Sequence, residues 1–321
     1  QTLQTIYKFE FRVVVVGGYH VRHYFSSQKN PTPLYMGVLC FFLFLSTGVT
    51  FGQPVPILIH QPEGFFPDQI GNEWHYEGRI LEGTVNQIAD RTFENVSKVT
   101  GTQKISGVNV IVFHDTNPGD QEPTDSYYLR DAAGIRYYGS KPGTRLEKQL
   151  IPYQVVRFPL EIPSSFEQLN RTNLNLGLDI DRDGQAERVD ILATMTIHDQ
   201  SPVTVPLGTY QKAIRMEAKM KMLVHLSRDG TQVKGFDSMT VWFVKDIGLV
   251  KYTERQIVPN PSTGNDRMIE ITEELKEAKL QGGTQLLSSR KASTYSTFRG
   301  RPVAPKLLQV SFPPTRFVSH P

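Results

Sequence analysis

Ala213-Ile-Arg-Met-Glu-Ala-Lys-Met-Lys-Met-Leu223 alternates apolar and charged side chains for most of its length. Successive side chains of a β-strand point to opposite faces, so this period of two predicts a strand with one buried face. Thioether side chains adapt to varied apolar partners, and the apolar face is therefore either ordinary core or part of a ligand-binding surface. On the second interpretation the candidate ligand-face residues are Ile214, Met216, Met220 and Met222.

Short runs rich in β-branched and aromatic residues recur on both sides of this segment, separated by Gly, Pro, Asn and Asp. This spacing is typical of an antiparallel meander and predicts a mainly β fold. The runs are residues 73–77, 108–113, 127–130, 134–138, 153–158, 189–197, 210–226, 239–244 and 249–252. Met268–Leu280 is compatible with either a helix or a closing strand. No repeat of roughly 20–50 residues is present, which argues against a propeller or solenoid.

An acidic segment at residues 179–190 has the spacing of a calcium loop. Calcium takes about six to eight oxygen ligands, so it needs many acids close together in sequence. The candidate metal ligands are Asp179, Asp181, Asp183, the backbone carbonyl of Gln185, Glu187 and Asp190, with Gly184 at the turn. The segment departs from an EF-hand because its last position is Asp instead of Glu and its flank predicts a strand. The alternatives are a structural Ca²⁺ site and an acidic turn without metal.

The N-terminal region predicts export. An apolar run of about ten residues begins at Met36, and small residues follow at Thr50 and Gly52. The run is too short to span a bilayer, and it predicts a signal peptide at 36–52 that is cleaved before Gln53. Residues 1–35 are then an extension that precedes the true start. The only cysteine, Cys40, lies in this run, so a mature chain would have no disulfide and no thiolate metal site.

Charge is distributed unevenly along the chain, although the formal net charge is only +3. Residues 280–321 hold six basic residues and no acid, whereas residues 36–279 hold 25 basic and 31 acidic residues. The acidic body argues against a nucleic-acid surface. The tail is rich in Gly, Ser, Thr, Pro and Arg without sustained periodicity, which predicts a disordered segment from residue 280.

Three motifs resemble a family when they are taken in order. They are Phe65-Phe-Pro67 with Gly71-Asn-Glu-Trp74-His-Tyr76, Val205-Pro-Leu-Gly208-Thr-Tyr210 with Ile214-Arg-Met-Glu217, and Thr240-Val-Trp242 with Gly248-Leu-Val-Lys251. They resemble motifs of exported bacterial proteins of uncharacterised function with a YmcC-like fold, related to the lipoprotein carriers LolA and LolB. The resemblance spans residues 62–255. It implies a curved antiparallel sheet, or open half-barrel, over residues 53–279, and it assigns no catalytic residue.

The sequence contains no motif of an enzyme. A Gly-x-Ser-x-Gly elbow, a phosphate-binding glycine loop and a His-Glu-x-x-His pair are all missing. The leading hypothesis is a non-enzymatic cell-envelope protein, in the periplasm or outside the cell, that holds an apolar or amphipathic ligand or a protein partner in its concave sheet. A calcium-stabilised structural or adhesion module without a pocket is the alternative, and a hydrolase of envelope polysaccharide is a weaker one.

Overall fold

The computed structural model describes residues 56–60, 62–84, 87–119, 122–258, 266–281 and 286–288. The predicted extension at 1–35 and the predicted signal peptide at 36–52 lie outside the described residues. Most of the predicted tail lies outside them as well. No helix in the described part of the chain has the length and apolarity needed to cross a membrane.

The described residues are mainly in β-strands. The strands that build the large sheet and its short additions are β2 (Glu73–Thr84), β3 (Gln87–Ile105), β4 (Val108–Asp115), β5 (Thr124–Asp131), β6 (Gly134–Lys141), β7 (Tyr153–Arg157), β9 (Ser164–Asn175), β10 (Arg188–Ile197), β11 (Ser201–Val205), β12 (Gly208–His225), β13 (Gln232–Val244), β14 (Gly248–Val258), β15 (Arg267–Lys279) and β16 (Leu286–Ser288). A separate ribbon pairs β1 (Ile57–Ile59) with β8 (Leu160–Ile162). The helical elements are η1 (Pro62–Phe65) and α1 (Glu147–Leu150).

The large sheet consists of two antiparallel meanders joined by one long-range pairing. Its strand order is β7-β6-β5-β4-β3-β2-β15-β14-β13-β12-β10-β9, so all neighbours are close in sequence except β2 and β15. These two strands pair from Glu73 with Lys279 to Thr84 with Arg267. The predicted antiparallel meander and curved sheet are therefore confirmed, with β15 as the closing strand at Met268–Leu280.

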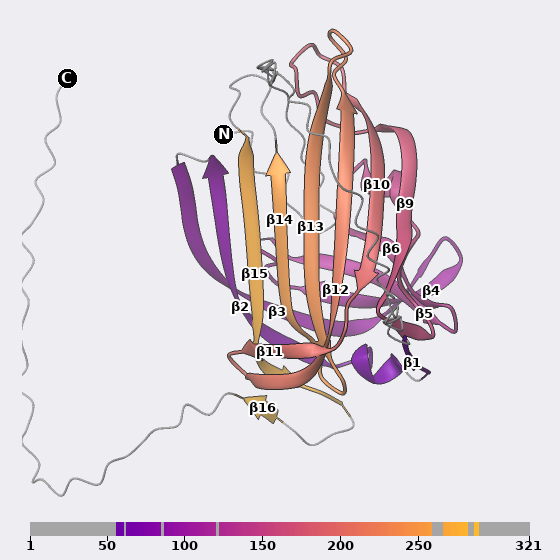
Figure 1. Cartoon of the computed structure of the whole chain (residues 1–321), viewed down its shortest axis with the longest axis vertical. Helices are drawn as coiled ribbons and strands as arrows, with labels where there is room; N and C mark the ends of the chain where they lie inside the picture. The colour runs from indigo at the N-terminus through magenta and orange to yellow at the C-terminus, as the bar shows by residue number, and fades with distance from the viewer. Residues whose placement is uncertain are drawn as a thin grey trace, which may run out of the picture. The chain divides into compact units, whose positions relative to one another are not determined.

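The sheet curls until its two ends lie near each other. The strands β15, β14, β13, β12, β10 and β9 stand side by side, and β2 and β3 bend so that β4, β5 and β6 pass behind β12 and β13 (Figure 1). The end strands β7 and β9 come into contact, but no ladder joins them among the described residues. One core cluster of buried apolar side chains includes Phe166 of β9, Met195 of β10, Ile214 of β12 and Ile271 of β15.

The period-two alternation predicted for residues 213–223 is confirmed in β12. Ile214, Met216, Met220 and Met222 are all buried, whereas Lys219 and Lys221 between them are exposed. Ile214 and Met216 pack in one core cluster, and Met220 and Met222 pack in a second one. This face of the strand is packed core.

The long strands β3 and β9 and the short strands β1, β8, β11 and β16 fall outside the runs predicted from sequence. The runs predicted from sequence missed β3 and β9, because both carry many polar residues and residues 87–92 of β3 are exposed on both faces. The prediction that the chain is disordered from residue 280 is wrong at β16, where Leu286–Ser288 pairs with Glu277–Lys279. Backbone pairing with the end of β15, which extends beyond its ladder with β14 at Glu274, positions this segment.

The junction of β2 with β15 carries an ionic cluster. The Glu73 carboxylate contacts Lys279 Nζ at 2.8 Å, His75 Nε2 at 2.6 Å and Lys98 Nζ at 3.3 Å. Hydrogen bonding to Lys279, and then to His75, lowers the pKa of Glu73 to about 2, against the opposing effect of burial.

We expect Glu73→Gln to flatten the acid limb of the stability profile. A lowered pKa in the folded state contributes stability above the unfolded pKa of about 4.5, and this contribution is lost as the pH falls toward about 2. The measurement is thermal unfolding between these two pH values. The control is Glu94→Gln, because the Glu94–Lys276 pair is open to solvent. Equal acid limbs in wild type and Glu73→Gln would contradict this assignment.

Candidate functional site

A cavity of about 290 Å³ lies inside the curled sheet. One wall is formed by inward side chains of β2 to β7, and the facing wall by β13, β14 and Glu273 of β15. Phe65, Phe66, Pro67 and Asp68, at the end of η1 and after it, also line the cavity. The lining is predominantly apolar, and the few polar groups in it come from Asp68, Asn95, Ser97, Asp115, Ser126, Arg130 and Glu273.

A continuous row of aromatic rings crosses the first wall. Trp74 of β2 stacks on Phe113 of β4 at 6.2 Å, and Phe113 meets the ring of Tyr128 of β5 edge-on at 5.6 Å. Tyr137 of β6 lies 5.3 Å from Tyr128 and 5.3 Å from Tyr153 of β7. The rings share one face of the sheet. Tyr128 pairs directly with Tyr137 and Tyr137 with Tyr153, and Phe113 pairs with Ser126, two residues from Tyr128 and therefore on the same face. The row gives the cavity a wide, rigid apolar surface.

The beginning and the end of the family resemblance meet at this cavity. Trp74 Nε1 donates to the carbonyl oxygen of Ile247 at 2.7 Å, and the Tyr76 hydroxyl donates to that of Leu249 at 3.0 Å. Gly248 between them has φ +93°, and a Cβ there would lie 3.1 Å from Pro67. This position therefore favours glycine for two reasons: its backbone is in the left-handed region, and the η1 segment approaches it closely.

Three carboxyl groups line the cavity, and the neutral side-chain amide of Asn95 donates hydrogen bonds to two of them. Asn95 Nδ2 donates to Asp115 Oδ1 at 3.1 Å and to Glu273 Oε1 at 3.0 Å. The side-chain oxygen Oδ1 of Asn95 accepts a hydrogen bond from the backbone N–H of Asn117 at 3.1 Å, so the orientation of the side-chain amide is fixed. The third carboxyl, Asp68, pairs with Arg130 at 2.7 Å.

Burial changes the pKa of several of these groups. It raises the pKa of Asp115, although hydrogen bonds from Asn95 and Ser97 act in the opposite direction. The residue Asp115 as a whole is partly exposed to solvent, but its carboxyl group is surrounded by protein atoms. Burial also raises the pKa of Asp68 against the opposing charge of Arg130. The pKa of Tyr76 lies well above its usual value because of burial and the nearby Glu273 and Asp115.

The side chains chosen from sequence as a ligand face do not line this cavity. Ile214, Met216, Met220 and Met222 lie in the packed clusters, and the adjacent strand β13 supplies Met239, Val241 and Phe243 to the cavity wall. Pattern alone does not distinguish an apolar face that packs from one that leaves space. The motifs that carry the resemblance were the better signal, because Phe66, Trp74 and Leu249 all line the cavity.

The acidic loop between β9 and β10 brings three of its predicted ligands together. One carboxylate oxygen from each of Asp179, Asp181 and Glu187 lies within 4.8 Å of the others. Glu187 has no exposed surface, and its Oε1 accepts the backbone N–H groups of Ile180 and Asp181 at 2.7 and 3.0 Å. Its other oxygen, Oε2, is buried without a hydrogen-bond partner among the described residues. Burial, followed by the charges of Asp181 and Asp179, raises the pKa of Glu187.

The other three predicted ligands lie outside this cluster. Asp183 accepts from the Ser227 hydroxyl at 2.9 Å, and Gln185 is exposed and donates its backbone N–H to Asp183. Asp190 accepts from the backbone N–H of Asn173 at 2.7 Å and pairs with His225 at 3.0 Å. Backbone N–H groups also compensate the acids of the loop, since Asp179 accepts those of Asp183 and Gly184. A loop this acidic therefore folds partly on its own hydrogen bonds.

Histidine–carboxylate pairs occur across the strands but not in the cavity lining. His114 Nδ1 lies 2.7 Å from Asp125, and His198 Nε2 lies 3.3 Å from Glu217. The sequence neighbours Asp115 and Asp199 are not the partners, as expected for residues that alternate between the two faces of a strand.

The fold and the site describe a mainly β protein whose curled sheet encloses an apolar cavity with a few acidic groups. No protein-family model and no curated protein matches the chain. Solved structures similar to it include a predicted exported protein with a YmcC-like fold from Bacteroides fragilis and a predicted lipoprotein from Parabacteroides distasonis. Each is 13% identical, covers 66% of this chain and 98% of its own, and has a TM-score of 0.26. A DUF1329 family protein from Desulfovibrio piger is 11% identical, covers 71% of this chain and 95% of its own, and has a TM-score of 0.21.

We expect Gly248→Ala to lower the free energy of unfolding by more than about 1 kcal/mol, because the new Cβ strains a positive φ and displaces Pro67. Denaturant unfolding measures the change. Gly208→Ala is the matched control, since a Cβ at Gly208 meets no atom within 4 Å. Equal losses in the two variants would show that the contact between Gly248 and the η1 segment is unimportant.

Proposed function

We propose that this protein is a non-enzymatic, exported cell-envelope protein that holds an apolar or amphipathic ligand inside its curled sheet. The observation that carries the proposal is the cavity of about 290 Å³, lined mostly by apolar and aromatic side chains with a few convergent polar groups. Small-molecule sites in proteins have this composition. Ordinary cores are close-packed and leave few voids larger than a water molecule, so a space of this size is unlike a core.

The export part of the proposal rests on the short apolar run that begins at Met36 and on the nature of the similar solved structures. Two of those structures are described as an exported protein and a lipoprotein. The destination is the periplasm or the outside of the cell. The relation to the lipoprotein carriers LolA and LolB remains part of the proposal, because a carrier of acylated cargo also needs an apolar cavity.

A cavity-filling substitution tests ligand binding. Met239 lines the cavity from β13, and Ser238 next to it points to the other face of the strand. We expect Met239→Trp to weaken binding of the apolar dye N-phenyl-1-naphthylamine at least tenfold, because the larger ring occupies the space. Dye fluorescence titration gives the affinity, and circular dichroism establishes that the variant is folded.

Ser238→Trp is the matched control and should bind the dye like the wild type. If the wild type does not bind the dye, and native mass spectrometry of the protein purified from its own cells shows no retained small molecule, the ligand-holding function is wrong. Equal binding by wild type and Met239→Trp would place the dye elsewhere and remove its support for the cavity.

The alternative function, a calcium-stabilised structural module, has one specific observation in its favour. Glu187 Oε2 is buried without a partner in the described structure and belongs to the cluster with Asp179 and Asp181. A buried carboxylate that lacks a partner costs stability, and a cation would compensate it. We propose that Ca²⁺ binds this cluster with a structural role. Asp190 and Asp183 lie outside the cluster, which favours a site completed by water and backbone oxygens.

Calcium binding predicts a shift in thermal stability. A ligand that binds only the folded loop raises the free energy of unfolding by about 2.7 kcal/mol when its concentration is about 100 times its Kd. We expect a higher Tm in millimolar calcium than in chelator for the wild type, and no difference for Glu187→Gln. Asp190→Asn is the control, because Asp190 pairs with His225 away from the cluster and its loss should leave the calcium shift in place. Equal Tm values of the wild type in calcium and chelator would leave the segment as an acidic turn.

A polysaccharide hydrolase is the weakest of the three functions. The two carboxylates of most glycoside hydrolases flank the bond that is broken. Asp115 and Glu273 instead accept hydrogen bonds from the same Asn95 nitrogen, while Asp68 is engaged by Arg130.

A further inference from the structure

The charge of the cavity lining is unbalanced. Asp68, Asp115 and Glu273 contribute three carboxyl groups, whereas Arg130 is the one cationic side chain among the described residues of the lining. Arg130 is held by two groups, since it pairs with Asp68 at 2.7 Å and donates to the carbonyl oxygen of Phe66 at 3.2 Å. The other charged groups of the lining, Asp115 and Glu273, are therefore both acidic, and they face a mostly apolar space.

The acidic side of the cavity is built into the sheet and is not a loose surface feature. Asp115, Asn95 and Glu273 come from β4, β3 and β15, and Glu273 and Asn95 are both almost fully buried. The single Asn95 amide holds the two carboxyl groups close together. Two carboxylates near each other in a poorly solvated space repel, and a cation placed beside them is stabilised more strongly than it would be in water.

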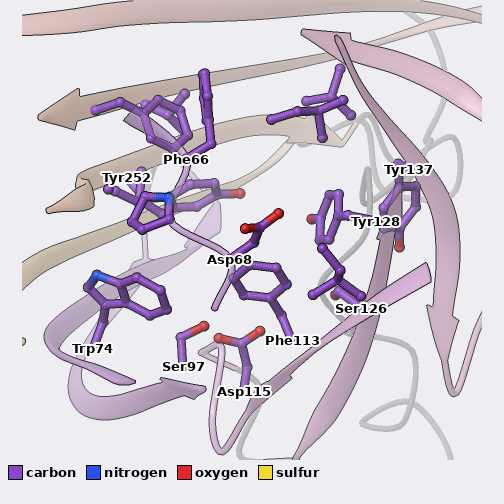
Figure 2. A pocket seen from close by; sticks show the side chains of 18 of the residues that line it. Phe66, Asp68, Trp74, Ser97, Phe113, Asp115, Ser126, Tyr128, Tyr137 and Tyr252 are labelled. Atoms are coloured by element: carbon purple, nitrogen blue, oxygen red, sulfur yellow. The ribbon is translucent and has the colours of Figure 1, made fainter. Parts of the chain in front are cut away.

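Aromatic rings stand next to these acids. Figure 2 shows the carboxyl groups of Asp68 and Asp115 among the rings of Trp74, Phe113 and Tyr128. The face of an aromatic ring attracts a cation, and quaternary ammonium groups are recognised in proteins by such rings. The same rings provide an apolar surface for a hydrocarbon chain. The carboxyl groups and the ring faces thus favour the same ligand, a cation attached to an apolar chain.

We propose that the cavity binds a cationic amphiphile, an amine or quaternary ammonium group attached to an apolar body. The cationic group lies beside Asp115 and Glu273, and the apolar body lies along the row from Trp74 to Tyr153. This inference rests on the proposed function, because it names the ligand class of the same cavity. A fatty acid or another anionic amphiphile is disfavoured, since its head group would meet Asp115 and Glu273 while Arg130 is engaged by Asp68.

Three probes with the same decyl chain test the inference: decyltrimethylammonium, decyldimethylamine N-oxide and decyl sulfate. They carry a positive, a net neutral and a negative head group. Isothermal titration calorimetry below the micelle concentration of each probe gives its affinity for the full chain. We expect the ammonium probe to bind at least tenfold more tightly than the sulfate, with the N-oxide between them. Asp115→Asn and Glu273→Gln should each reduce the ratio of ammonium to sulfate affinity several-fold.

Glu94→Gln is the matched control, because Glu94 is exposed, pairs with Lys276 and lies outside the cavity lining, and it should leave the ratio unchanged. Circular dichroism checks each variant, and Asp115→Asn decides the result if Glu273→Gln does not fold. If all three probes bind equally well and Met239→Trp abolishes their binding, the cavity is an apolar site without preference for a cation, and the inference is wrong. Tighter binding of the sulfate would also overturn it. Failure of all three probes and of the apolar dye would reject both the inference and the proposed function.

Discussion

The antiparallel pairing of β2 with β15 is the constraint on which the rest of the structure depends. Every other ladder of the large sheet joins strands that are close in sequence, so each meander needs only local turns. The β2–β15 ladder joins residues 73–84 to residues 267–279 and closes nearly the whole described chain into one loop. Ordering so long a loop carries an entropic cost before its contacts form. The ion cluster around Glu73 and the buried Leu275 stabilise this seam.

The cavity follows from that seam and from the curl of the two meanders. Once β2 and β15 are paired, the inner faces of β4–β7 and β13–β14 are opposite each other, and their side chains do not fill the space between them. Trp74 and Tyr76 donate to the carbonyls of Ile247 and Leu249, which connects the first strand of one meander to the β13–β14 turn of the other. Gly248 lets Pro67 approach this turn, so the η1 segment covers the cavity.

Acidic residues are compensated in different ways in the two candidate sites. In the loop at residues 179–190, the backbone N–H groups of Gly184 and Arg228 donate to Asp179 and Asp181, and a buried oxygen of Glu187 has no hydrogen-bond partner among the described residues. In the cavity, a neutral amide holds Asp115 and Glu273, and aromatic rings surround the space in front of them. The first arrangement suits a small hard cation with oxygen ligands, and the second suits an organic cation.

The sequence by itself determined the fold class, most strands and the acidic loop, because period-two patterns, turn residues and closely spaced carboxylates act over a few residues. It did not reveal β3 and β9, whose polar residues carry little apolar pattern, or β16, which pairs with the end of β15. Only the tertiary structure decided which apolar face packs and which lines a cavity. The methionine row of β12 lies in packed core clusters, whereas Met239 of β13 lines the cavity. Asp115 and Glu273 meet only through the β2–β15 pairing, and no local pattern encodes a contact between residues so far apart in the chain.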